Sequence, residues 1–353
     1  MKYTRARLAS IGYELAPIVV SSQELEQRLA PLYERLHLPA GQLEALTGIA
    51  ERRWWSQGQT LVDGASAAAT KALAQAGVAA SDIDVLIYTG VCRELFEPAT
   101  ACAVADRIKC DSDTHIYDLS NACLGMLNGI IDVANRIELG QIRAGLVVSC
   151  ESAREINDLM IEEMLGNQTM EQLTLSLATL TGGSGAAAIL LTDGSFGPQH
   201  QPQLVGGVAR SRAEHHDLCR WGLFAGAGGA TSSDPHIRQR MQTDSVNVLK
   251  YGVQLGMETW EHFLSHLEWP AESIDRVICH QVGSSHQSQI LRAFGISADK
   301  DFSSYAYLGN IGTVSLPLTA ALADQRGFLQ HGDRVAFLGI GSGLNCMMLG
   351  WQW

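Results

Sequence analysis

The chain has 353 residues, of which 46% are hydrophobic and 18% charged, so it can bury a large interior and lacks the composition of a disordered protein. Its 37 acidic residues outnumber its 25 basic ones, and the net charge of −12 argues against nucleic acid or an anionic membrane as a partner. No apolar run approaches the roughly 18 residues that cross a bilayer. We expect a soluble protein without membrane insertion.

The eight cysteines indicate the redox compartment. They are scattered along the chain, with no CxxC pair and no spacing typical of zinc ligands. Glu14 interrupts the only apolar stretch near the N-terminus, so we expect no signal peptide. A reducing cytoplasm fits this pattern best. The sequence also predicts no bound metal and no cofactor, since it has no Walker loop and no GxSxG nucleophile elbow.

The predicted elements alternate between helices and strands. Apolar periodicity favours helices, and short β-branched runs after polar turns favour buried strands. An acidic, Met- and Leu-rich stretch at 153–180 reads as a helical insertion, and a Gly-, Ser- and His-rich stretch spans 212–242, including Phe224 to Ala230. In chain order we predict a helix at 64–76, a strand within 80–91, a strand at 115–119, a helix at 124–137, a strand within 140–148, a helix at 245–267, a strand at 276–279, a helical stretch at 312–329 and a strand at 347–351.

The order of these elements indicates an internal duplication. Residues 80–91 resemble 271–282, an offset of 191, and residues 140–148 resemble 332–339. Two copies of one α/β unit are therefore expected, with mostly parallel sheets covered by helices. The division we predict is an N-terminal half, 1–200, and a C-terminal half, 201–353.

Cys123 is the candidate nucleophile. It stands in Ser-Asn-Ala-Cys-Leu-Gly, between the predicted strand 115–119 and the predicted helix 124–137. A cysteine at such a junction meets unpaired N–H groups and the positive end of the helix dipole, which favours the thiolate and lowers the thiol pKa. The alternative is a structural cysteine.

Two further residues are expected at the same place. His280 ends the predicted strand 276–279, at the carboxyl edge where open α/β sheets bind ligands, and its counterpart in the first copy is Thr89. Asn310 lies in a glycine-flanked turn that corresponds to the Cys123 turn in the duplication. Taken singly, His280 could be structural and Asn310 a turn or N-cap residue. The duplication predicts that both face the point where Cys123 lies.

The segment 339–344, Gly-Ile-Gly-Ser-Gly-Leu, could be mistaken for a phosphate-binding loop. It does not match the GxGxxG fingerprint of a βαβ unit, because strand-like residues follow it at 347–351. A turn whose backbone N–H groups point into the site is more consistent with this pattern, and such a turn forms an oxyanion hole.

Together these residues resemble the ketoacyl synthase III branch of the thiolase superfamily. The resemblance implies a thiolase fold, a duplicated αβαβα five-layer architecture with two mixed sheets, and a homodimer. It implies an acyl thioester on Cys123, a second substrate held by His280 and Asn310, and an oxyanion hole from the backbone N–H groups of Cys123 and Ser342. The motifs are Thr47-Gly48-Ile49, Asn121-Ala122-Cys123, His280-Gln281, Gly309-Asn310-Ile311-Gly312 and Gly341-Ser342-Gly343.

Within that branch the chain most resembles the OleA family, which starts bacterial long-chain olefin synthesis. The pointer is Arg-Glu-Leu-Phe-Glu-Pro at 93–98, because chain-initiating synthases carry an apolar residue where this chain has Glu97. In the OleA family that glutamate reaches the site of the neighbouring subunit and acts as the base. Removing an α-proton from an acyl-CoA requires a positioned base, whereas decarboxylation of a malonyl thioester does not. The alternative for Glu97 is an exposed loop carboxylate.

The sequence departs from the chain-initiating synthases at the residues that hold the CoA nucleotide. Chain-initiating synthases place a tryptophan and an arginine just before Thr-Gly-Ile, where this chain has Gln42 and Leu46. Arg52 and Arg53 are candidate substitutes, with the tryptophans that follow them.

The expected function is head-to-head, non-decarboxylative Claisen condensation of two fatty acyl-CoA molecules to a 2-alkyl-3-keto acid. The partners implied are the acyl-CoA substrates, a second copy of the chain and downstream olefin-pathway enzymes. The alternatives are a decarboxylating 3-oxoacyl-ACP synthase III that uses malonyl-ACP, an acyltransferase acting on an alcohol or amine, and a catalytically silent partner subunit.

Overall fold

The structure is a computed structural model that describes residues 1–224 and 238–353. Nine strands form its main sheet in the order β11-β12-β13-β8-β1-β7-β6-β4-β5. Four of the predicted elements have the predicted bounds or lie within a residue of them: strands 115–119 and 276–279 and helices 124–137 and 245–267. The strands are β1 (Arg7–Leu15), β4 (Val85–Thr89), β5 (His115–Leu119), β6 (Ala144–Glu151), β7 (Gly185–Thr192), β8 (Gln203–Ser211), β11 (Arg276–Cys279), β12 (Arg334–Gly341) and β13 (Asn345–Gln352).

The sheet repeats itself across its middle. The order β1-β7-β6-β4 in the first half matches β8-β13-β12-β11 in the second, and the halves join through a single pair, Arg7 with Gln203. Thr89 at the end of β4 and His280 just after β11 occupy equivalent places, as the duplication predicts.

The expectation of mostly parallel sheets is wrong. β4 pairs in parallel with β5 and β6, and β11 with β12, but β1, β7, β8 and β13 all run antiparallel to their neighbours. The physical reason is the connections. A turn at 342–344 joins β12 directly to β13, and the chain leaves β6 and enters β7 at the same end, where Glu151 pairs with Gly185.

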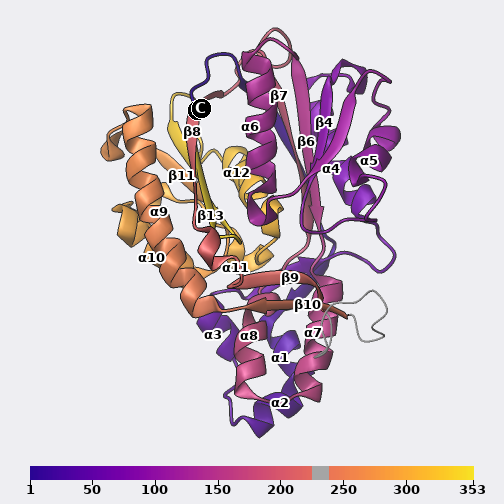
Figure 1. Ribbon diagram of the computed structural model, residues 1–353, viewed down its shortest axis with the longest axis vertical. Coiled ribbons are helices and arrows are strands. Elements are labelled where there is room, and N and C mark those ends of the chain that lie inside the picture. Colours follow the sequence, from indigo (N-terminus) through magenta and orange to yellow (C-terminus); the bar gives the residue numbers. More distant parts are fainter. Residues whose placement is uncertain (225–237) are drawn as a thin grey trace.

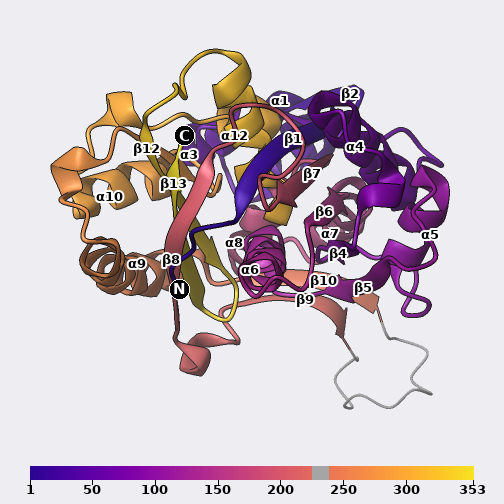
Figure 2. The ribbon, with the colours of Figure 1, turned by 90° about the horizontal axis from the view of Figure 1, so that it is seen from above.

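Helices divide the strands into five layers, αβαβα (Figure 2). Helices α6 (Gly125–Glu138) and α12 (Ser315–Gln325) form the middle layer, with α4 (Leu61–Ala76) and α5 (Thr100–Ile108) on one outside and α9 (Ser245–Leu267) and α10 (Ser284–Phe294) on the other. Side chains of each strand alternate between two cores. In β12, for example, Val335 and Phe337 face the middle helices, whereas Ala336 and Leu338 pack under α9 and α10.

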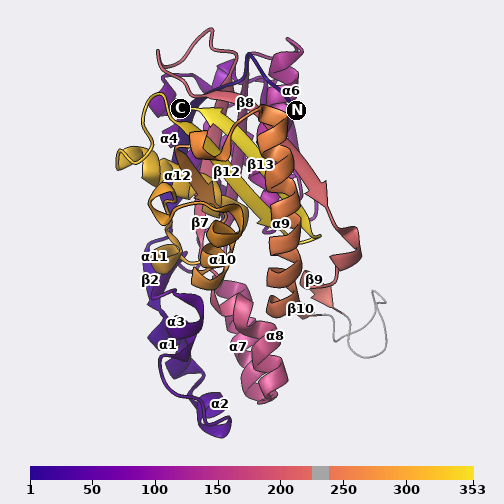
Figure 3. The same cartoon turned by 90° about the vertical axis from the view of Figure 1, so that its left-hand side faces the viewer.

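A smaller cap lies beyond one end of the sheet (Figures 1 and 3). It has its own apolar core, built from both its N-terminal part and the two helices that fill the expected helical stretch 153–180. No helix in the described ranges combines the length and apolar character that a membrane span needs. The cap contains β2 (Ile18–Ser21), α1 (Ser22–Arg28), α2 (Ala30–Arg35), α3 (Gln42–Thr47), β3 (Glu51–Trp54), α7 (Arg154–Gly166) and α8 (Met170–Leu180), and the hairpin β9 (Cys219–Phe224) and β10 (Arg238–Thr243) crosses between cap and sheet.

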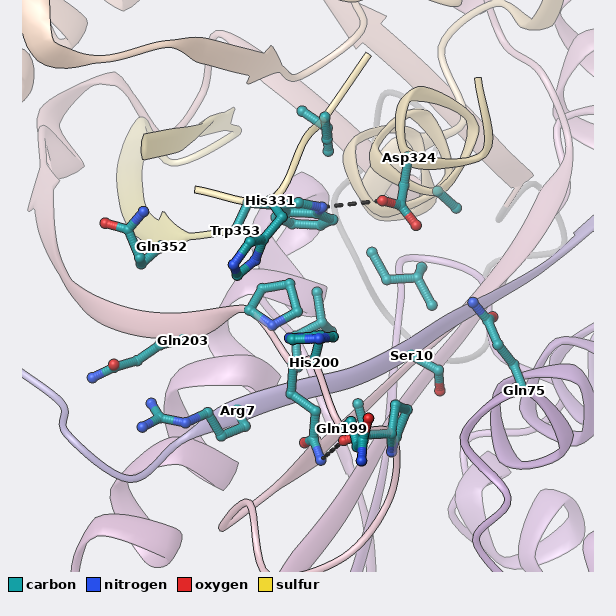
Figure 4. A pocket seen from close by; sticks show the side chains of 18 of the residues that line it. Arg7, Ser10, Gln75, Gln199, His200, Gln203, Asp324, His331, Gln352 and Trp353 are labelled. Atoms are coloured by element: carbon teal, nitrogen blue, oxygen red, sulfur yellow. Dashed lines mark hydrogen bonds between the residues drawn. The ribbon is translucent and has the colours of Figure 1, made fainter. Parts of the chain in front are cut away.

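The opposite end of the sheet holds a cavity of about 650 Å³ (Figure 4). Its lining includes Ser10 of β1, His200, His331 and Trp353. The Trp353 indole N–H donates to Asp324 Oδ1 at 3.0 Å. None of Cys123, His280 and Asn310 lines this cavity. β13 separates the two ends by roughly 25 Å, at about 3.3 Å per strand residue.

Candidate active site

Cys123 lies in a tight turn between β5 and α6. The turn is a single 3-10 segment, η2 (Ala122–Leu124), and α6 continues from it at Gly125. Ala122 has φ +44°, a left-handed conformation that costs an L-residue roughly 1–2 kcal/mol. Such strain is typical of residues that a fold holds in place for function. Here it fixes the backbone immediately before the thiol.

His280 follows β11, and its side chain is directed toward the middle helical layer, at whose end the Cys123 turn lies. Ile278 of β11 packs in the middle core, and a strand alternates its side chains, so His280 two residues later is expected on that face. Its N–H donates to the Leu338 carbonyl at 2.9 Å, and 5% of the residue is exposed. Nδ1 is buried and has no partner among the described residues. Burial, reinforced by His286, lowers the pKa of His280 to about 3, so the imidazole is neutral at ordinary pH.

Asn310 is held by its backbone. Its N–H donates to the Thr181 carbonyl and its own carbonyl accepts from Gly183 N–H, both at 2.9 Å. This contact is close enough that a Cβ at Gly183 would overlap the Leu308 carbonyl oxygen at 2.0 Å. The side-chain Oδ1 accepts from Gly312 N–H at 3.1 Å, whereas Nδ2 donates to no other described residue. The amide NH2 group, with both of its N–H donors, is therefore left for a ligand.

The turn after β12 completes the site. A Cβ added at Gly341 would lie 3.5 Å from both the N and the Cβ of Cys123, which places this end of β12 directly beside the nucleophile. Asn345 Nδ2 donates to Asn121 Oδ1 at 3.1 Å and so ties the 342–344 turn to the Cys123 turn. The Ser342 N–H also approaches the Cys123 thiol closely enough to favour its ionised form.

The expected low pKa of Cys123 is wrong. Burial, with nearby Cys219 and Glu151 as smaller causes, raises the pKa of this thiol to about 12, although the backbone N–H groups of Cys123 and Ser342 act in the opposite direction. The helix-dipole argument omitted the cost of desolvating a charge at this partly buried position. The Cys123 thiol and the His280 imidazole are therefore both neutral at ordinary pH.

Comparisons with known proteins identify the family. Residues 264–353 match the family described as 3-oxoacyl-[acyl-carrier-protein] synthase III C terminal. The acyl-CoA:acyl-CoA alkyltransferase of Shewanella oneidensis is 56% identical, and that of Xanthomonas campestris pv. campestris is 34% identical, with 100% of both chains covered in each case. The chain belongs to the acyl-CoA:acyl-CoA alkyltransferase family. It is therefore a transferase.

Solved structures of this family share the fold. Cerulenin-bound Xanthomonas campestris OleA superposes with a TM-score of 0.92 at 34% identity, covering 100% of this chain and 98% of that one. A variant of the same protein with lauric acid and lauroyl-CoA bound gives 0.91, with 99% and 100% covered. The thiolase fold expected from the sequence is thus confirmed, and so is the resemblance to the ketoacyl synthase III branch.

Glu97 lies on an exposed loop between β4 and α5. Only Glu94 among the loop carboxylates is anchored there, by accepting from Val62 N–H at 3.1 Å, and Glu97 itself bonds to no described residue. Beside it, Leu95 is 59% exposed and Phe96 90% exposed. These two adjacent side chains form an apolar, exposed tip beside Glu97.

The suggestion that Arg52 contacts CoA is wrong. Arg52 is fully buried in the cap, where its guanidinium donates to the Val20 carbonyl and to Ser22 Oγ. Period-two alternation in β3 directs it inward. Arg53 is partly buried and donates to the Ala16 carbonyl at 3.3 Å, and its role at CoA stays a prediction. The Gly-rich residues 225–230 within the 212–242 stretch lie outside the described residues.

Sequence reasoning missed two residues behind the nucleophile. Glu151 at the end of β6 is 4% exposed and accepts from two backbone N–H groups of the Glu97 loop. Thr313 is 1% exposed and accepts the Met126 N–H of α6 at 2.8 Å. A signal for Thr313 existed, since the offset of 191 places the counterpart of Cys123 at residue 314, one residue after Thr313. For Glu151, a carboxylate closing an apolar run was the available signal.

Proposed function

We propose that this protein joins two fatty acyl-CoA molecules by non-decarboxylative head-to-head Claisen condensation and releases a 2-alkyl-3-keto acid. The observation that carries the proposal is the full-length match to two acyl-CoA:acyl-CoA alkyltransferases, combined with Cys123, His280 and Asn310 at one end of the middle layer. The substrates are CoA thioesters, and the reaction as proposed uses no cofactor.

The first step is acylation of Cys123. A neutral thiol is a weak nucleophile, so it must lose its proton as it attacks. His280, neutral and able to accept, takes that proton and passes it to the departing CoA sulfur. The oxyanion that forms on the acyl carbonyl is stabilised by the backbone N–H groups of Cys123 and Ser342, which already approach the sulfur.

The second step needs a base. We assign Glu97 of the partner subunit to remove the α-proton of the second acyl-CoA, while His280 and the free amide donor of Asn310 stabilise the enolate oxygen. The enolate carbon attacks the acyl carbonyl, and the Cys123 thiolate leaves and takes up the proton that Glu97 had removed. Water then cleaves the remaining CoA thioester to the acid and free CoA.

Support for Glu97 comes from its spacing. Solved variants of Xanthomonas campestris OleA include replacements of a cysteine and of a glutamate that precedes it by 26 residues. Glu97 precedes Cys123 by the same 26 residues. The exposed Leu95 and Phe96 beside it support a loop that another subunit covers.

A homodimer is the assembly we propose. β5 is the outermost strand of its side of the sheet, so one edge of its backbone has no partner among the described strands. Natural proteins seldom leave such an edge open, and a second copy of β5 would pair with it symmetrically. The cytoplasm is the proposed location, in keeping with eight free thiols, and downstream olefin-pathway enzymes are the proposed recipients of the product.

Product analysis from a single substrate tests the function. Purified protein incubated with one long-chain acyl-CoA alone should give a 2-alkyl-3-keto acid, or the ketone that forms when this acid loses CO2. If product appears only when malonyl-ACP is added, the protein is a decarboxylating synthase and the proposal is wrong. If the acyl group passes instead to an alcohol or amine, condensation is not its reaction.

Mixing two inactive variants tests the role of Glu97 across the dimer. Glu97→Ala should keep acylation of Cys123 but lose condensation by about 10²–10⁴-fold, the usual contribution of a general base. Co-expressed with Cys123→Ala, it should recover about a quarter of wild-type activity, because roughly half of randomly paired dimers would be mixed and each mixed dimer would have one intact site. No recovery would place Glu97 in its own subunit's site or outside catalysis.

A further inference from the structure

Glu151 is a buried carboxylate that the proposed mechanism does not use. It is the last residue of β6 and is 4% exposed. Carboxylates are rarely buried unless their oxygens are bonded, because removing a charge from water is costly. Its two oxygens accept separate N–H groups, Oε1 from Val91 at 3.1 Å and Oε2 from Cys92 at 3.0 Å. Both donors belong to the loop that carries Glu97.

The other side of Glu151 faces the turn after Asn310. A Cβ built on Gly312 would lie 3.0 Å from Glu151 Oε1, so glycine is what lets this turn approach the carboxylate. Gly312 also has φ +52°, which favours glycine independently. Its N–H donates to Asn310 Oδ1 at 3.1 Å, so the residue that touches Glu151 also orients the Asn310 side chain.

We propose that Glu151 is a positioning residue for condensation, which clamps the base of the Glu97 loop to the Asn310 turn. This inference rests on the proposed function in one respect, the role of Glu97. In a dimer the clamp would join a loop that serves the partner's site to a turn that serves its own.

The contacts around the loop's base agree with a clamp. The Tyr88 hydroxyl lies 2.9 Å from the Cys92 carbonyl oxygen, and Ser152 N–H donates to Cys92 Sγ at 3.4 Å. Residues 93–98 beyond this base are all exposed. The loop is therefore fixed where Glu151 holds it and free where Glu97 would meet a partner.

The negative charge of Glu151 allows a second test of the clamp, through the pKa of Cys123. Burial raises the pKa of Glu151, and the N–H groups of Val91 and Cys92 lower it, so the clamp itself favours the ionised form. The negative charge of Glu151 contributes to the raised pKa of Cys123, and the thiols of Cys92 and Cys150 also lie close to it. Removing the charge should make Cys123 easier to ionise.

The variant Glu151→Gln tests the clamp. Glutamine has the same shape but one oxygen, so one of the two loop N–H groups would face an amide donor. We expect acylation of Cys123 within about threefold of wild type and condensation at least tenfold slower. The pH profile of Cys123 alkylation by iodoacetamide, read by peptide mass spectrometry, should move to lower pH. Asp84→Asn is the matched control, because Asp84 also accepts two backbone N–H groups, from Arg143 and Ala144, and lies at the far end of the sheet.

Two results would overturn the inference. One is condensation by Glu151→Gln within twofold of wild type. The other is an equal loss of acylation and condensation with an unmoved alkylation profile, which would indicate general damage to the fold. If Glu151→Gln does not fold, Gly312→Ala disturbs the same contact from the other side, and normal condensation in that variant sinks the idea.

Failure of the proposed function can be distinguished from failure of the proposed role of Glu151. A wild-type enzyme that makes no product from acyl-CoA alone contradicts the function, and the ratio of condensation to acylation is then measured with a malonyl thioester as the second substrate. Because the Asn310 turn would still act there, a normal ratio in Glu151→Gln would overturn the clamp in that case too.

Discussion

The Cys123 turn and the Asn310 turn are two versions of one structure. Each is a 3-10 segment that follows a loop and opens a helix of the middle layer, η2 (Ala122–Leu124) before α6 and η6 (Gly312–Val314) before α12. Each begins with a left-handed residue, Ala122 at φ +44° and Gly312 at φ +52°. The second position differs: it is Cys123 in one and Thr313 in the other. The same backbone thus presents a nucleophile once and a structural hydroxyl once.

The two turns therefore share one backbone geometry, and the residue at the second position decides whether the turn carries a nucleophile. Thr313 is 1% exposed and bonded to Met126 N–H, whereas Cys123 is partly exposed beside the 342–344 turn. In the second turn the residue with a proposed function is Asn310, which precedes the 3-10 segment. We assign its side-chain amide to the enolate oxygen. Changing one turn at a time should therefore give different kinds of damage.

Removing the nucleophile should have the largest effect. Cys123→Ala and Cys123→Ser should form no acyl adduct with a long-chain acyl-CoA, and condensation should fall by roughly 10⁴-fold or more. Intact-protein mass spectrometry of wild type should show one acyl mass per subunit. An adduct that persists in Cys123→Ala, or maps to another of the eight cysteines, would contradict the assignment.

Removing the donor in the second turn should have a smaller and more selective effect. Asn310→Ala should still acylate Cys123, because its amide is assigned to the enolate and not to the acyl carbonyl. Condensation should fall by about 10²–10³-fold, the usual loss for one such donor. Burst acylation and steady-state product formation, measured on the same sample, separate the two steps. Turnover at the wild-type rate would exclude this role.

Changing the structural hydroxyl should alter stability more than chemistry. Thr313→Val leaves the Met126 N–H buried without an acceptor, which costs about 1–3 kcal/mol of unfolding free energy. Denaturant unfolding measures the loss. Thr174→Val is the control, since its hydroxyl donates to the Met170 carbonyl on an exposed helix face and its replacement should change stability by less than about 0.5 kcal/mol.

The smallest expected effect is a change in the free energy of unfolding when backbone strain is altered. This change should be of opposite sign in the two turns. Ala122→Gly relieves a left-handed alanine and should stabilise the protein by up to about 1 kcal/mol, the strain relief being partly offset by the greater freedom of glycine in the unfolded chain. Gly312→Ala should destabilise it, because it adds strain and a close contact with Glu151. If both changes move the unfolding free energy in the same direction, the two turns are not equivalent.

Much of this comparison could be predicted from the sequence. Strand 276–279 was identifiable because a short β-branched run ends at His280, and strand 115–119 because it leads into the Cys123 turn. The duplication matched the Asn310 turn to the Cys123 turn without any structure, because the offset of 191 carries residue 123 to residue 314, four residues after Asn310. The division into halves at residue 200 stays a prediction, although the sheet order repeats.

What could not be predicted depends on distant contacts. The burial of Arg52, the raised pKa of Cys123 and the two bonds of Glu151 each depend on residues far away in the chain, which no local pattern reports. The antiparallel strands were missed for a related reason: alternating elements indicate crossovers, but the direction of β7 and β13 is set by where the connecting segments return.

The bond between Met126 and Thr313 limits how this gene can be divided. The donor opens a helix of one half, and the acceptor comes from the other, while α6 and α12 share a single apolar core between the two sets of strands. A fragment that ended between β7 and β8 would leave that core half-covered and the first turn of α6 without its acceptor. Either part expressed alone would therefore expose to water the apolar surface that α6 and α12 bury together in the intact chain.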